Sequence, residues 1–199
     1  MSRPYTKFNL IEFCINVPYA HCMLRPQDIV VLLKLSLVSG RPTYLRLARD
    51  LHLYPSEVHS SIKRARLSHL VQGTAPDERL NRAALLEFLL HGIRYAFPAE
   101  KGALTRGVPT GYAGPPLNTT IAASSDPPPV WPYAEGTTRG FKFAPLHKHV
   151  PEAALEDPRL YELLALVDAI RDGRAREREL AGRELTKRLE SIPDAEPES

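Results

Sequence analysis

The fold is decided by the stretch Thr43–Ala65, which reads TYLRLARDLHLYPSEVHSSIKRA. Apolar residues recur at helical spacing on both sides of a turn around His52. Thr43 is a suitable cap for the first helix, and Pro55 stands where the first turn of the second helix tolerates proline. The stretch therefore predicts a short helix after Thr43, a tight turn, and a longer helix over residues 55–69.

The second helix of this pair has an apolar face and a basic face. Val58, Ile62 and Ala65 recur at helical spacing and form the stripe that is expected to be buried. No acid follows Glu57 within this helix, and the chain from residue 41 to residue 70 holds six lysines and arginines against two acids. The outward face is predicted to carry Ser56, His59, Ser60, Lys63, Arg64 and Arg66.

The neighbouring segments complete a helical block. Pro26–Leu37 has apolar residues at helical spacing and predicts a helix that ends before Gly40. Two short extended runs within residues 70–80 predict a hairpin. Asn81 is then expected to cap a further helix, which Pro98 ends.

This order of elements is typical of a DNA-binding motif. A short helix, a tight turn and a second helix with a basic outer face form a helix-turn-helix, whose second helix enters the major groove. With the hairpin after it, the segment 24–97 resembles the MarR/ArsR-like winged helix-turn-helix transcriptional regulators. The resemblance implies a dimer that binds double-stranded DNA and reads a pseudo-palindrome with half-sites about one helical turn apart. The matching positions in the two helices are Leu47, Ala48, Leu51, Val58, Ile62 and Arg64.

Residues from both helices and from the hairpin are predicted to contact the DNA. Lysine and arginine neutralise phosphates, and arginine also reads guanine edges with two hydrogen bonds. Hydroxyl and imidazole groups near a helix N-terminus reach bases or phosphates. The alternative for each residue is a solvated polar surface without a ligand. The predicted contacts are Thr43, Ser56, His59, Ser60, Lys63, Arg64, Arg66 and Arg79.

Two features depart from the resembled pattern. Tyr54 occupies the position where serine or threonine usually caps the second helix. Asp77 and Glu78 lie at the tip of the hairpin, where a phosphate backbone would repel carboxylates. Arg79 is therefore the contact expected from the wing.

Composition limits the classes of protein to consider. The chain has 199 residues, 43% of them hydrophobic and 25% charged, with a mean hydropathy of -0.26, as in soluble globular proteins. The longest apolar run, Ile29–Val38, is far shorter than the ~20 residues of a membrane-spanning helix. Two cysteines and the lack of a secretory signal favour a cytoplasmic protein.

No catalytic, cofactor or metal site is expected. The sequence has no phosphate-binding glycine loop, dinucleotide fingerprint or nucleophile elbow. Neither the group Cys14, His21 and Cys22 nor the pair His147 and His149 has the further ligands that a zinc ion needs. The protein is therefore predicted not to be an enzyme.

Residues 98–151 have an unusual composition. They hold ten of the 19 prolines and six of the 11 glycines, which argues against helix or regular sheet. They also hold Trp131 and several other aromatic and leucine residues, unlike a flexible polar linker. This segment is predicted to be an extended strap that lies partly over a folded surface.

Helical spacing returns in residues 152–191. They predict a pair of helices, beginning at Pro158 and Arg174, each with a leucine stripe. Such a pair has too little interior to fold alone, so its stripe is expected to form a dimer interface, with the winged helix or the strap as alternative partners. Residues 192–199 are predicted to be an acidic tail, and residues 1–23 an N-terminal appendage.

The predicted architecture is mainly α, with a winged helix-turn-helix domain, a proline-rich extended strap and a C-terminal helical pair. The expected function is that of a cytoplasmic, dimeric transcriptional regulator, a repressor that reads DNA sequence with helix 55–69. The alternative is a protein-interaction module, such as an antitoxin or adaptor that masks a partner protein. A stoichiometric protein partner after purification would favour this alternative.

Overall fold

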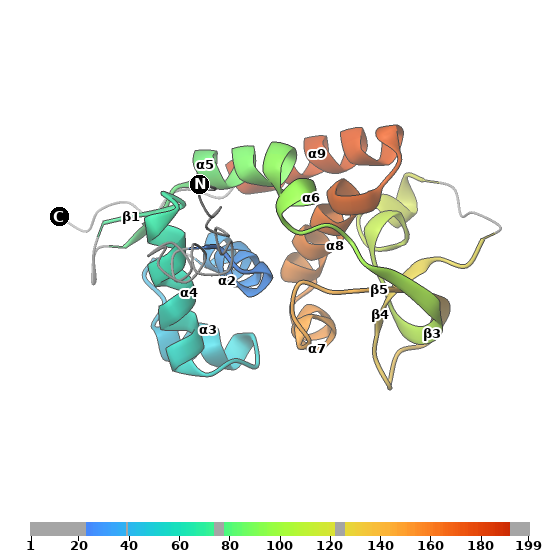
Figure 1. Cartoon of the computed structure of the whole chain (residues 1–199), viewed down its shortest axis with the longest axis horizontal. Coiled ribbons are helices and arrows are strands. Elements are labelled where there is room, and N and C mark those ends of the chain that lie inside the picture. The colour runs from blue at the N-terminus through green and yellow to red at the C-terminus, as the bar shows by residue number, and fades with distance from the viewer. Residues whose placement is uncertain (1–22, 39, 74–77, 122–125, 192–199) are drawn as a thin grey trace, which may run out of the picture.

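The structure is a computed structural model that describes residues 23–38, 40–73, 78–121 and 126–191 (Figure 1). Within these ranges the chain is mainly helical with two small sheets, which agrees with the predicted mainly α class. None of the helices described is both long and apolar enough to cross a membrane. The predicted acidic tail, and all of the predicted appendage except Met23, lie outside the described residues.

The stretch after Thr43 folds into the two predicted helices. They are α3 (Tyr44–Asp50) and α4 (Pro55–Leu67), joined by a tight turn and packed on α2 (Pro26–Leu37) (Figure 1). The Thr43 hydroxyl accepts a hydrogen bond of 3.2 Å from a backbone N–H in the first turn of α3. The predicted cap is therefore confirmed.

Helix α4 begins as predicted but without a hydroxyl cap. The Glu57 carboxylate accepts a hydrogen bond of 2.8 Å from the backbone N–H of Tyr54. This bond satisfies a donor at the helix start that has no partner within the helix. The helix ends at Leu67, two residues before the predicted end, and His69 follows with a left-handed φ of 60°.

The predicted hairpin and the helix after it are both present. Gln72 pairs with Arg79 in the antiparallel hairpin, and the Asn81 side chain caps the next helix by accepting the N–H of Ala84 at 3.1 Å. We refer to residues 23–97 as the N-terminal head. Its remaining elements are β1 (Val71–Gln72), β2 (Arg79–Leu80), α5 (Arg82–Glu87), a π-helical turn (Phe88–Gly92) and α6 (Ile93–Ala96).

The proline-rich segment contains regular sheet, so the sequence prediction for it was wrong in this respect. Its strands are β3 (Lys101–Pro109), β4 (Pro129–Pro132) and β5 (Thr138–Phe143), which close into a small barrel. Strand β3 pairs antiparallel with β4 and β5, and β4 pairs parallel with β5. Trp131 and Phe143 are buried in the core, as expected for a segment that lies on a folded surface.

The prolines fit this sheet because they lack only the N–H donor and keep the carbonyl acceptor. The Pro129 carbonyl accepts a hydrogen bond of 3.0 Å from the N–H of Thr110. Glycine allows a close approach between strands, since a Cβ atom at Gly107 would lie 1.9 Å from the carbonyl oxygen of Trp131. High proline and glycine content therefore specifies a tight, irregular barrel here and does not prevent pairing.

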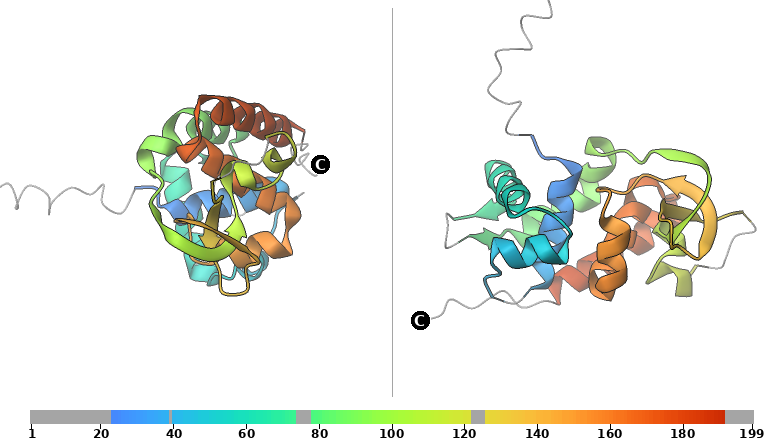
Figure 2. Two further views of the ribbon diagram at one scale, coloured as in Figure 1. Left: turned by 90° about the vertical axis from the view of Figure 1, so that its right-hand side faces the viewer. Right: turned by 90° about the horizontal axis from the view of Figure 1, so that it is seen from below.

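The residues after the sheet form α7 (Val150–Glu156), α8 (Pro158–Asp172) and α9 (Ala175–Glu190). The predicted pair corresponds to α8 and α9, and α7 was not predicted. Helix α8 lies in the middle of the molecule, with the head on one side and the sheet on the other, and α9 lies across α8 and α5 (Figures 1 and 2).

The leucine stripes of this pair are buried inside the chain. Leu160, Leu164 and Val167 on α8, and Leu185 and Leu189 on α9, are at most 2% exposed. Helices of the head and residues of the proline-rich segment cover α8, because the pair alone could not enclose a core. The expectation that these stripes form a dimer interface is therefore wrong. The stripes instead pack on the two alternative partners, the head and the proline-rich segment of the same chain.

Candidate nucleic-acid interface

The exposed side of α4 carries three of the predicted contact residues in one row. Ser56, His59 and Lys63 are exposed, and their spacing of three and four residues places them on one face of the helix. Lys63 has no hydrogen bond or ion pair with any residue that the structure describes. Ser60 is half-buried beside this row, and its hydroxyl donates a hydrogen bond of 2.8 Å to the Ser56 carbonyl.

Arg64 lies on a different side of α4, which corrects its predicted place on the outer face. Its guanidinium donates from Nε and Nη2 to the two carboxylate oxygens of Asp28, at 2.8 and 2.6 Å. Asp28 is fully buried, and 12% of the Arg64 side chain is exposed. A buried carboxylate requires a partner of this kind. Arg64 therefore connects α4 to the start of α2.

Arg66 is half-buried between α4 and the hairpin. Its Nη1 donates to Oε1 of Glu78 at 3.3 Å, and the Tyr44 hydroxyl donates to the other oxygen of the same carboxylate. Glu78 thus joins α3, α4 and the start of β2, with 15% of its side chain exposed. Burial, and then the hydrogen bond with Glu78, raises the pKa of Tyr44 to about 12, so the phenol remains a donor.

The inward position of Glu78 corrects the prediction that it would repel a phosphate backbone. Asp77, the other acid named there, lies outside the described residues. The other described carboxylates of residues 41–80 also have partners that donate a hydrogen bond or form an ion pair. Asp50 lies 3.2 Å from the ammonium of Lys34, and Glu57 accepts the hydrogen bond at the start of α4. Among the described residues, the carboxylates of this region are therefore engaged while several cations point outward.

Further exposed cations lie on α3 and on the hairpin, both of which pack against α4. Arg46 and Arg49 are exposed on α3, and 79% of the Arg49 side chain is accessible. They belong to the basic stretch of the sequence but were not among the predicted contacts, although their spacing of three residues places them on one helix face. Arg79, the contact predicted from the hairpin, is exposed on β2.

The start of α3 lies next to the middle of α4. The rings of Tyr44 and His59 meet edge to face, with their centroids 5.7 Å apart. Thr43, at the exposed N-terminal end of α3, is therefore close to the same surface. The structure thus brings together Thr43, Ser56, His59 and Lys63, and it directs Arg64 and Arg66 to partners inside the head.

Charged side chains connect the head to α7 and α8. The Lys34 ammonium lies 2.9 Å from the carboxylate of Asp157, which also caps α8, and His52 lies 3.2 Å from Glu156. Burial alone would raise the pKa of Asp157, but the hydrogen bond from Lys34 and backbone N–H donors outweigh burial and lower it. This junction holds the turn between α3 and α4 against the rest of the molecule.

Three histidines lie at the same junction. The ring centroids of His147 and His149 are 5.4 Å apart, and those of His52 and His149 are 6.2 Å apart. Burial, and then the charges of His149 and Lys148, lowers the pKa of His147, although Glu57 acts in the opposite direction. The backbone N–H of His149 lies 3.4 Å from Nδ1 of His147, an arrangement that suits a neutral ring.

The protein is expected to lose stability as the pH falls below about 6.5, in part through His147. A histidine whose pKa is lowered in the folded state binds its proton more readily in the unfolded chain, so acid favours unfolding. His147→Gln should therefore lose less stability than the wild type between about pH 7.5 and about pH 5.5 in urea unfolding curves. An identical pH dependence in the two proteins would contradict this role of His147.

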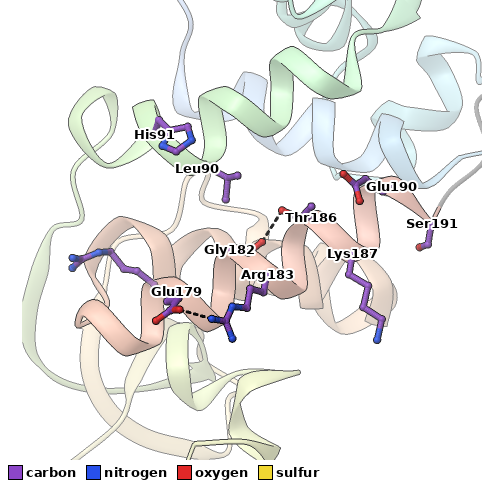
Figure 3. Close-up of a pocket in the computed structure, with 10 residues that line it drawn as sticks. Leu90, His91, Glu179, Gly182, Arg183, Thr186, Lys187, Glu190 and Ser191 are labelled. Atoms are coloured by element: carbon purple, nitrogen blue, oxygen red, sulfur yellow. Dashed lines mark hydrogen bonds and ion pairs between the residues drawn. The ribbon is translucent and has the colours of Figure 1, made fainter.

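Two hollows lie away from the row on α4. A shallow groove of about 810 Å³ runs between α9 and the π-helical turn, and a hollow of about 520 Å³ lies between the sheet and the start of α9 (Figure 3 shows the first). In the groove Glu179 pairs with Arg183 along α9, and Lys187 points away from Leu90. These charged side chains pair with each other or face solvent, so they do not form a binding site for one ligand in the groove.

No group of three or more histidine, cysteine, aspartate or glutamate side chains in the described part of the chain is arranged to hold a metal ion. Cys14, His21 and Cys22 lie outside that part. Comparisons with protein-family models, with curated proteins and with solved structures give no match for this chain.

Proposed function

We propose that the protein binds double-stranded DNA through the N-terminal head, with α4 in the major groove. The observation that carries this proposal is the row of Ser56, His59 and Lys63 on the exposed face of α4, together with exposed arginines on α3 and on the hairpin, which both pack against α4. A helix-turn-helix docks with its second helix in the groove and its first helix across the backbone. The positions of α3, α4 and the hairpin suit a winged version of that motif.

The exposed residues have separate tasks in this arrangement. Lys63 and Arg79 neutralise phosphates, and so do Arg46 and Arg49 on α3. Ser56 and His59, near the start of α4, contact base edges or phosphates. The hydroxyl of Thr43 keeps its own hydrogen free to donate to a phosphate while its oxygen caps α3.

Arg64 and Arg66 act in this proposal through the geometry of the head. Their partners, Asp28 and Glu78, occupy the guanidinium groups and hold α4 against α2 and the hairpin. Removing either arginine would therefore weaken DNA binding indirectly, by disturbing α4. Substitutions at these two positions are unsuitable for mapping the DNA contact.

A head of this kind fits a transcriptional regulator that acts as a repressor. A symmetric dimer would present two copies of α4 to half-sites about one helical turn apart. Because the stripes of α8 and α9 are buried within the chain, a dimer would use another surface. Light scattering with and without DNA measures that stoichiometry. The alternative, a module that masks a partner protein, is compatible with DNA binding, since a partner could use a surface outside the head.

The double variant Lys63→Ala/Arg79→Ala is expected to bind DNA more weakly and with a smaller salt dependence. The slope of log affinity against log salt is negative, and each lost phosphate contact makes it less steep by about 0.9. Losing two contacts should therefore reduce its magnitude by about 1.8. The measurement is fluorescence anisotropy across a salt series, with DNA from upstream of the protein's own gene.

The matched control removes the same charge from α9. Arg176→Ala/Lys187→Ala loses two exposed cations that are far from α4 in sequence and belong to another element. Its salt slope should equal that of the wild type. Equal losses in the two double variants would indicate a general charge effect, and an unchanged slope in Lys63→Ala/Arg79→Ala would rule out the proposed interface.

A further inference from the structure

The sheet carries two exposed arginines directly opposite each other on neighbouring strands. Arg106 on β3 and Arg139 on β5 are paired in the antiparallel ladder, and both are exposed. Neither guanidinium has a hydrogen bond or ion pair with any residue in the described ranges. Like charges that face each other across a ladder destabilise a sheet. The arrangement therefore weakens the free protein, and no described side chain compensates for it.

Two apolar side chains extend the same face. Leu104 and Phe141 are the neighbouring opposite pair, and residues two apart on a strand point to the same side. They are 45% and 44% exposed. We refer to Leu104, Arg106, Arg139 and Phe141 as the arginine–phenylalanine face.

This face lies far from the proposed DNA interface. Strands β3 and β5 are at one end of the long axis of the molecule, and α3 and α4 are at the other (Figures 1 and 2). Helix α8 lies between them, so DNA bound to α4 would leave the sheet uncovered. A ligand on the arginine–phenylalanine face would therefore bind separately from DNA on α4.

We propose that the arginine–phenylalanine face binds an acidic segment of a partner protein. Carboxylates of that segment pair with Arg106 and Arg139, and an apolar side chain packs on Leu104 and Phe141. A guanidinium presents two parallel N–H donors that match a carboxylate, and arginine and aromatic residues supply much of the binding energy in protein interfaces. The partner's negative charge removes the repulsion between the two arginines.

The composition of this face favours a protein over a nucleic acid. Sites for single-stranded nucleic acids combine a track of cations with several aromatic rings that stack on successive bases. Here the two arginines lie side by side on neighbouring strands, and Phe141 is the single ring among the four residues. Leu104 has no aromatic surface on which a base could stack, whereas it suits an apolar side chain of a peptide.

The first test uses a fluorescein-labelled peptide of glutamate and aspartate residues around one leucine and one phenylalanine. Anisotropy should show binding by the wild type and a Kd at least ten times higher for Arg106→Gln/Arg139→Gln and for Phe141→Ser. The same peptide with glutamine and asparagine in place of the acids should not bind. Lys63→Ala/Arg79→Ala should bind the acidic peptide normally, which separates this result from the DNA proposal.

The second test compares stability with binding. Arg139→Glu replaces a repulsion with an attraction to Arg106, so its melting temperature should equal or exceed that of the wild type while peptide binding is lost. A lower melting temperature would assign the arginine pair to the fold and overturn the proposal. Unchanged peptide binding in the variants would overturn it too. So would displacement of the peptide by a 12-nucleotide single-stranded DNA whose own binding requires Arg106 and Arg139.

Discussion

Replacing Arg171 with alanine is expected to lower the free energy of unfolding by about 3–5 kcal/mol, the range for removing one partner from a buried ion pair. The side chains of Asp168 and Arg171 are 2% and 4% exposed, and Nη1 lies 2.7 Å from the carboxylate. Without Arg171 the buried Asp168 retains two neutral donors, the Thr110 hydroxyl and the Trp131 indole N–H. Neutral donors do not offset the desolvation of a full charge.

Arg171 also satisfies backbone groups from segments that meet at α8. Its Nε donates to the carbonyl of Phe97 at 2.8 Å, and its terminal nitrogens donate to the carbonyls of Pro98 and Ala144, both at 3.3 Å. The guanidinium lies 5.3 Å from the centre of the Phe143 ring. Arg171→Lys keeps the charge, but an ammonium cannot reproduce the planar set of donors. The free energy of unfolding of Arg171→Lys should therefore lie between that of the wild type and that of Arg171→Ala.

Trp131 is the single tryptophan of the chain, and its indole N–H donates to Asp168 at 2.6 Å. Its fluorescence in urea therefore reports directly on this network. Burial raises the pKa of Asp168, and Arg171 opposes that rise. The deficit of Arg171→Ala should accordingly shrink in acid, where a protonated Asp168 carries no charge. A loss below about 1 kcal/mol, or a deficit that does not change with pH, would contradict this account.

Arg64→Ala is expected to be destabilised by a similar amount, about 3–5 kcal/mol, with a fall in melting temperature on the order of 10 °C. The variant would leave the carboxylate of Asp28 buried with the backbone N–H of Arg25 as a donor. The hydrogen bond with Asp28 raises the pKa of Arg64, so it favours the charged guanidinium. Thermal unfolding followed by circular dichroism measures the change.

Lys63→Ala is the matched control, because Lys63 is the preceding residue on the same helix and is exposed. Its stability should stay within about 0.5 kcal/mol of the wild type while its affinity for DNA falls. Asp28→Asn/Arg64→Ala should be milder than Arg64→Ala alone, since it removes the buried charge as well. An unchanged melting temperature in Arg64→Ala would mean that its guanidinium is solvated and free to contact DNA.

These variants separate two uses of basic residues that the sequence does not distinguish. Lys63 and Arg64 are neighbours with the same formal charge, yet one is exposed and the other is held by Asp28. That partner lies 36 residues earlier in the chain, in a different helix. Helical spacing indicates which residues share a face, but it does not reveal a buried carboxylate on another element that competes for a guanidinium.

Local signals predicted most of the head and the last helices. The starts of α3, α4 and α8 follow from Thr43, Pro55 and Pro158, because caps and first-turn prolines act within one turn of a helix. Apolar residues that recur about every 3.6 positions then indicate how far each helix extends. The hairpin was predicted from two short runs on either side of a turn, and the structure adds its register, with Gln72 opposite Arg79.

The sheet shows where such signals fail. Proline and glycine content argued against regular strands, since each residue type weakens a strand when it is considered alone. The barrel forms because Pro129 uses its carbonyl and because Gly107 permits an approach that a side chain would block. Both conditions depend on the neighbouring strand, which comes from a distant part of the chain.

By itself the sequence determined the helices of the head, the caps at Thr43 and Asn81, and the spacing that puts Ser56, His59 and Lys63 on one face of α4, because each depends on residues within a few positions of one another. The tertiary structure alone decided that Arg64 faces Asp28, that α8 is buried within its own chain, and that Arg106 meets Arg139 across the sheet. Burial and charge pairing are properties of surfaces brought together from distant segments, so no local pattern specifies them.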